Sequence, residues 1–171
     1  MSALSTPARV ARGMVAGAIA GAVASFAMDR FQALTSSLLP TDGGEDEPTT
    51  EQAADALAKA TTGYEVPDVA KPLAGQAVHY ALGTGLGIAY GIAAEFRPAV
   101  TAGYGCAFGI GTATLLDEAA VPAVGLGEAP WTASPAITLY AYASHLVFCG
   151  VAEFVRRQVA GTLTLSSETS S

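Results

Sequence analysis

Six ionisable side chains fall within apolar stretches of this sequence, and they are the residues whose types could support chemistry. They are Asp29, His79, Asp117, Glu118, His145 and Glu153. Burying an ionisable group among apolar residues costs free energy, so each is a candidate for function. Three interpretations fit these residue types: pairing that fixes neighbouring helices, a relay for protons or cations, and a metal site with both histidines and a carboxylate as ligands. Spacing alone leaves all three open.

The common catalytic motifs are missing from the sequence. It contains no HExxH, no GxSxG and no Walker loop. Cys106 and Cys149 lack the spacing of zinc or redox sites, and we expect both to be small packing residues. We therefore expect no enzymatic activity, no cofactor and no bound metal.

The composition indicates that these side chains lie in a membrane. Apolar residues make up 51% of the chain and charged residues only 13%, where soluble domains carry roughly 25% charged residues. Four segments are apolar over the roughly 20 residues that a spanning helix needs: residues 13–36, 76–95, 98–121 and 136–156. The first has the basic flank of a signal peptide, but its length and the lack of a convincing cleavage site favour a retained span. The expected fold is all-α, a single domain of four transmembrane helices with the lipid bilayer as its partner.

Positive charges set the expected orientation of these helices. The arginines that flank the four segments on one side are Arg9, Arg12, Arg97, Arg156 and Arg157. Cytoplasmic loops carry an excess of Lys and Arg, so both termini should face the cytoplasm, with the chain in the inner membrane of a bacterium. The sequence has no basic patch, and we expect no nucleic-acid partner.

Two further segments lie outside the expected spans. The acidic loop at residues 40–74 should be extracytoplasmic and should contain a short helix, with Thr49 and Gln52 at capping-box spacing and Gly63 as the C-cap. The polar tail at residues 160–171 is expected to be disordered.

Glycine recurs every four residues in three of the segments, at Gly13, Gly17, Gly21, Gly83, Gly87, Gly91, Gly105 and Gly109. Lipid tails are as apolar as leucine, so helices in a membrane are held together by close backbone approach at small residues. We interpret the glycines as helix-packing surfaces, which would also allow a homo-oligomer. His79 and Glu95 share the register of the second run, but four residues advance by about 400°, so they lie on different sides of a straight helix. We expect Glu95 to be a solvated charge beside Arg97.

The helical rise of about 1.5 Å per residue places the candidate residues by depth. Asp29, His79 and the pair at residues 117–118 should lie at a similar level in the outer half of the membrane. His145 should lie near the midplane, and Glu153 about 12 Å deeper. A relay would run from the outer cluster through His145 towards Glu153.

Four stretches also carry a family likeness: GMVAGAIAGAVAS, AVHYALGTGLGIAYGIAAEFRP, LLDEAAVPAVGL and ASHLVFCGVAEFVRR. With these stretches, which cover most of the chain apart from the acidic loop and the tail, the sequence resembles the YagU-like family of uncharacterised bacterial inner-membrane proteins. The resemblance implies a small polytopic membrane protein and no particular activity. The expected function is that of an integral membrane protein without enzymatic activity, and the alternative is a proton or cation permease that uses the polar cluster as a relay.

Overall fold

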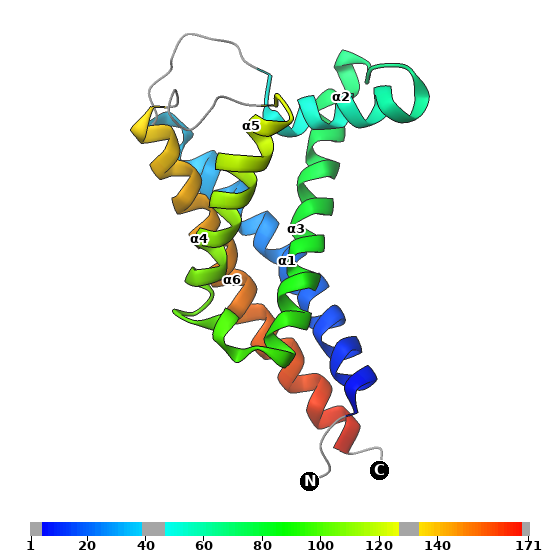
Figure 1. Cartoon of the computed structure of the whole chain (residues 1–171), viewed down its shortest axis with the longest axis vertical. Coiled ribbons are helices and arrows are strands. Elements are labelled where there is room, and N and C mark those ends of the chain that lie inside the picture. The colour runs from blue at the N-terminus through cyan, green and yellow to red at the C-terminus, as the bar shows by residue number, and fades with distance from the viewer. Residues whose placement is uncertain (1–4, 39–46, 127–133, 169–171) are drawn as a thin grey trace.

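The computed structural model describes residues 5–38, 47–126 and 134–168, and every regular element in this part of the chain is helical, which confirms the all-α class. The helices α1 (Thr6–Thr35), α3 (Lys71–Phe96) and α6 (Pro135–Glu168) are long and apolar enough to cross a membrane. A shorter run lies beside them and consists of α4 (Cys106–Leu115), a π-helical turn (Leu116–Ala120) and α5 (Val121–Ala123). The helix α2 (Thr49–Thr62) lies across the end of the bundle opposite both termini (Figure 1). Single 3-10 turns are formed by Ser36–Leu38, Asp68–Ala70 and Pro98–Thr101.

The third expected span, residues 98–121, is not one continuous helix. After the 3-10 turn, the backbone of residues 103–105 enters the left-handed region, with φ between 59° and 88°. Left-handed residues end a right-handed helix, and glycine, which occupies two of these three positions, adopts this conformation without steric cost. The α-helix therefore begins only at Cys106. Within the described residues, three helices rather than four are long enough to span a membrane as single elements.

Helices α1 and α3 run antiparallel and meet backbone to backbone. The facing pairs are Gly13 with Gly91, Gly17 with Gly87, and Gly21 with Gly83. A Cβ atom on Gly13 would lie 2.8 Å from the carbonyl oxygen of Gly91, and the other two pairs are closer still. Any side chain larger than hydrogen would force the two helices apart, so glycine is required at this contact. We call this contact the α1–α3 seam.

A second glycine contact joins α4 to α6. A Cβ atom on Gly105 would lie 2.8 Å from the carbonyl oxygen of Cys149, and one on Gly109 would lie 3.1 Å from that of His145. This α4–α6 seam holds the broken third segment along the last helix.

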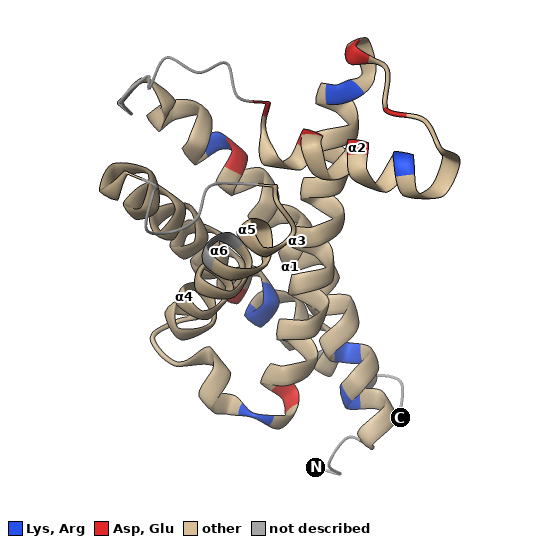
Figure 2. Ribbon diagram, turned by 45° about the horizontal axis from the view of Figure 1, so that its top comes forward, with Lys and Arg blue, Asp and Glu red and all other residues tan. Residues whose placement is uncertain are grey.

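In α1, the small side chains face the interior of the bundle and the large apolar side chains face outward. The buried residues are small apart from the last: Gly13, Ala16, Gly17, Ala20, Gly21, Ala24, Ser25 and Met28. The outward face carries the bulk, with exposed fractions of 42–55% at Met14, Val15, Ile19, Val23 and Phe26. This is the arrangement expected of a helix that packs through small residues and presents its apolar bulk to lipid. Figure 2 shows that long stretches of α1 and α3 carry no charged residue.

Two helix ends differ from the sequence-based expectation. Residues 160–168, expected to be disordered, continue α6, and the guanidinium of Arg12 donates a hydrogen bond of 2.7 Å to the hydroxyl of Thr164 there. In α2, Gly63 is the left-handed C-cap as predicted, with φ 81°. The predicted capping box is wrong, because Pro48 occupies the N-cap and the Gln52 amide donates instead to the carbonyl oxygen of Glu47.

Replacing Gly87 by alanine should destabilise the bundle, whereas the same change at Gly85 should not. A Cβ atom on Gly87 would lie 2.7 Å from the Cα atom of Gly21, while nothing lies within 4 Å of one on Gly85. Overpacking costs about 1–3 kcal/mol, and alanine at an open helical position is favourable by up to about 1 kcal/mol. Melting temperatures in detergent test this difference. Equal melting temperatures for the two variants would mean that α1 and α3 are not in contact at Gly87.

Candidate functional site

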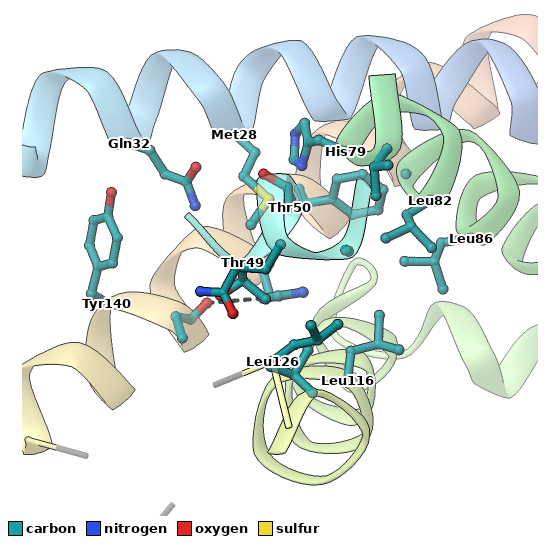
Figure 3. A pocket seen from close by; sticks show the side chains of 18 of the residues that line it. Met28, Gln32, Thr49, Thr50, His79, Leu82, Leu86, Leu116, Leu126 and Tyr140 are labelled. Carbon is teal, nitrogen blue, oxygen red and sulfur yellow. Dashed lines mark hydrogen bonds between the residues drawn. The ribbon is translucent and has the colours of Figure 1, made fainter. Parts of the chain in front are cut away.

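A cavity of about 860 Å³ lies in the half of the bundle next to α2. Its volume falls in the range of small-molecule sites, about 300–1,000 Å³. Its apolar wall includes Met28, Leu82, Leu86, Leu116, Val121, Leu126 and Phe148. Polar side chains on its lining include Gln32, Glu47, Thr49, Thr50, Gln52, His79, Thr138, Tyr140 and His145. Figure 3 shows leucines gathered along one side of the cavity, with Gln32 and Tyr140 at the other.

His79 on the cavity wall is held by α1. Its Nε2 atom lies 3.1 Å from Oδ1 of Asp29 and 3.4 Å from the carbonyl oxygen of Ser25. The second carboxylate oxygen of Asp29 accepts a hydrogen bond of 2.6 Å from the amide of Gln76. Both oxygens facing Nε2 are acceptors, so Nε2 carries the proton of the neutral ring. The carboxylate therefore fixes both the position and the tautomer of this imidazole.

His145 reaches the same cavity from α6. Its side chain is buried, and Nδ1 donates a hydrogen bond of 3.1 Å to the carbonyl oxygen of Ala141 one turn earlier. Below it on the same helix lie Phe148, Cys149 and Ala152, all no more than 3% exposed and packed in one apolar cluster. The cavity thus ends on a layer of buried apolar side chains.

Glu153 lies beyond this layer in a closed cluster of its own. Its side chain is fully buried and accepts hydrogen bonds from the hydroxyl of Tyr90 at 2.7 Å, from Arg156 at 2.8 and 2.9 Å, and from Arg157 at 2.5 Å. The ring of Tyr90 also packs on that of Phe108, with centroids 4.6 Å apart. These donors satisfy the carboxylate without help from the cavity.

Glu95 is not the solvated charge that its position at the end of the span suggested. It is only 8% exposed and receives two hydrogen bonds from the guanidinium of Arg12, at 2.9 and 2.5 Å, with Arg9 at 3.8 Å. This bidentate pair joins the start of α1 to the end of α3. Its partner is Arg12, which lies near the start of α1, and not Arg97, which is two residues away in the sequence.

The helix α2 is tied to the start of α3 by one lysine. The ammonium group of Lys71 lies 2.8 Å from Glu47, 3.1 Å from Asp55 and 3.5 Å from Asp68. The hydrogen bond from Lys71 is the main cause that lowers the pKa of Asp55, with a further contribution from the backbone N–H of Val66. A lowered carboxylate pKa stabilises the folded state above the ordinary pKa of aspartate, and this contribution is lost as the pH falls through the lowered value. The contact therefore persists at neutral and mildly acidic pH.

The structure brings together only part of the predicted cluster. Asp29 contacts His79, and His145 shares the cavity with His79, but Glu153 belongs to the separate cluster with Tyr90. The side chains of Asp117 and Glu118 lie outside the described residues. Among the described residues, no group of three His, Cys, Asp or Glu side chains could hold a metal ion.

The residues that sequence reasoning missed are the partners of the two buried glutamates. A single tyrosine in an apolar span forms no recognisable sequence pattern. Arg156, however, lies three residues after Glu153 in the sequence, and Tyr90 lies at the depth of Glu153 in the bundle. Matching each buried acid with a base or hydroxyl at the same depth would have found them.

Comparison with known proteins gives no match, since no family model, no curated protein and no solved structure matches the chain. The resemblance to the YagU-like family therefore stays a prediction from the residues.

Changing Glu153 to glutamine should destabilise the protein strongly, because it leaves two arginines beside a buried site without a carboxylate. Removing one partner of a buried ion pair costs about 3–5 kcal/mol. The matched control is Glu65→Gln, which breaks the exposed pair with Lys59, whose side chains are 65% and 62% exposed, and which should cost about 0–1 kcal/mol. Thermal unfolding in detergent compares the two. Similar losses for both variants would contradict the placement of Glu153.

Proposed function

We propose that the chain is a multi-pass protein of a bacterial cytoplasmic membrane, with four spanning segments and both termini in the cytoplasm. The long helices α1, α3 and α6 support three of these spans, and the helical run from Cys106 to Ala123, held along α6 by the α4–α6 seam, supports the fourth. Both termini lie at one end of the bundle and α2 at the other (Figure 1). Membership in the YagU-like family is part of this proposal.

The positive charges agree with this orientation. Arg9 and Arg12 at the start of α1 gather around Glu95, and Arg156 and Arg157 surround Glu153. An excess of arginine at the end of the bundle that holds the termini is typical of the cytoplasmic side.

Reporter fusions test this topology. A green fluorescent protein fused after Ser171 should fluoresce, and alkaline phosphatase inserted after Gly63 should be active, because the phosphatase needs disulfides that form only outside the cytoplasm. The exchanged fusions, with phosphatase after Ser171 and the fluorescent protein after Gly63, serve as controls and should be inactive. Active phosphatase at Ser171 would place the C-terminus outside the cytoplasm and contradict the proposed topology.

Within the membrane, the function that the geometry supports best is binding of a small apolar molecule in the cavity beneath α2. The observation that carries this proposal is the cavity itself, about 860 Å³ walled by leucines, with the imidazole of His79 held in place by Asp29. Ligand sites are largely apolar concavities with a few fixed polar groups, and this one fits that description.

A proton or cation permease is the second candidate, favoured by two histidines on one cavity, one of which is paired with Asp29. The route would have to continue from His145 to Glu153. Phe148, Cys149 and Ala152 form an apolar layer on the helix between these two residues. The carboxylate of Glu153 is also paired with arginines, and the geometry therefore favours binding over conduction.

Filling the cavity tests the binding function. Leu86→Trp enlarges a side chain on the cavity wall, whereas Leu139→Trp places the same side chain on an exposed position of α6 that does not line the cavity. Mass spectrometry of intact protein released from detergent micelles should detect a bound small molecule on the wild type and on Leu139→Trp, and none on Leu86→Trp. Equal bound mass on all three proteins, with unchanged circular dichroism, would contradict the proposal.

A further inference from the structure

We infer that the cavity binds an uncharged lipid-like molecule with a free hydroxyl group, and that this hydroxyl donates a hydrogen bond to Nδ1 of His79. The inference rests on the proposed binding function and names the class of ligand. Its three supports are the charge of the lining, the hydrogen bonds of His79 and the placement of the apolar wall.

The described residues of the lining offer no cationic partner for an anionic headgroup. No lysine or arginine lies among the described residues that line the cavity, and the one carboxylate there, Glu47, is paired with Lys71 at 2.8 Å. A phosphate or carboxylate brought into this site would lose its hydration without gaining a cationic partner. An uncharged polar group avoids that cost.

The hydrogen bonds of His79 leave its second ring nitrogen, Nδ1, able to accept a hydrogen bond from a ligand. The Nε2 atom faces two acceptors, Oδ1 of Asp29 and the carbonyl oxygen of Ser25, so its proton is committed to them. In the neutral ring, Nδ1 then presents a lone pair, and no described residue donates a hydrogen bond to it. A ligand hydroxyl can donate to this lone pair, whereas an ester, ether or quinone oxygen can only accept.

The rest of the cavity suits a hydrocarbon body. Leu82 and Leu86 of α3 face Leu116 at the start of the π-helical turn, and Phe148 of α6 also lines the cavity (Figure 3). Thr49 and Thr50 of α2 offer hydroxyl groups at the cavity lining for further oxygens of the ligand. A diacylglycerol and a quinol both combine a free hydroxyl with a hydrocarbon chain, and the shared chemistry covers both.

Matched ligand pairs test the hydroxyl. The first pair is 1,2-dioctanoylglycerol and its 3-acetyl ester, and the second is a short-chain ubiquinol and its dimethyl ether. Binding to the full chain in detergent is measured by mass spectrometry of the intact complex at a series of ligand concentrations. We expect at least one free hydroxyl compound to bind about fivefold more tightly than its blocked partner, since a hydrogen bond contributes about 1 kcal/mol. Preference within the glycerol pair or within the quinol pair identifies the source of the ligand.

Variants assign the effect to its residue. His79→Phe keeps an aromatic ring without Nδ1 and should bind the free and blocked compounds equally. Leu86→Trp should abolish binding of both compounds, and Leu139→Trp should leave the preference intact. Should His79→Phe fail to fold, as judged by its circular dichroism, the wild-type comparison of free and blocked compounds still decides the question.

The failures of the two proposals are distinguishable. Equal binding of the free and blocked compounds to the wild type, with binding of both lost in Leu86→Trp, would overturn the hydroxyl inference and leave the binding function intact. A preference that survives in a folded His79→Phe would also overturn it. Binding that Leu86→Trp leaves unchanged would overturn the binding function together with the inference.

Discussion

The contact on which the rest of the bundle depends is the backbone approach of α1 and α3. At the α1–α3 seam, each step of four residues along α1 is matched by a step of four back along α3. Continued by one step beyond the glycines, the same register pairs Arg9 with Glu95 and Ser25 with His79. Arg12 and Asp29, each about one turn further along α1, contact the same two residues. Because the glycines permit this close fit, the positions of both ionic contacts follow from the register of the seam.

The buried carboxylates at the two ends of the bundle are paired with different kinds of side chain. At the end with the termini, Glu95 and Glu153 are each met by arginines, whose planar guanidinium groups bind carboxylates with several hydrogen bonds. At the other end, Asp29 is met by a histidine and a glutamine. A guanidinium group carries only donors, but a neutral imidazole bound through Nε2 keeps a second nitrogen that can accept a hydrogen bond from another partner. That difference makes the end next to α2 the one suited to a ligand.

Much of this arrangement follows from the sequence, and the parts that do not have physical causes. Glycines every four residues and a shared depth for Asp29 and His79 are properties of helical rise and rotation, which the sequence carries directly. The break at residues 103–105 depends on the backbone angle φ, which a hydropathy pattern does not predict. The burial of Glu95 depends on where another helix places Arg12, and a straight-helix projection of α3 alone contains no such information. Pairing across helices needs the register of the seam before it can be predicted.

The cavity itself is a consequence of where glycine is and is not used. The α1–α3 and α4–α6 seams draw two pairs of helices together, and α1 also packs on α6. Between the pairs, α3 and α4 are in contact further from α2 through the rings of Tyr90 and Phe108, whose centroids are 4.6 Å apart. Towards α2, the facing residues are Leu82 and Leu86 on one side and Leu116 on the other, and no glycine seam closes the space between them. Large side chains keep helix backbones apart, so the same rule that tightens the seams leaves room for a ligand where leucine replaces glycine.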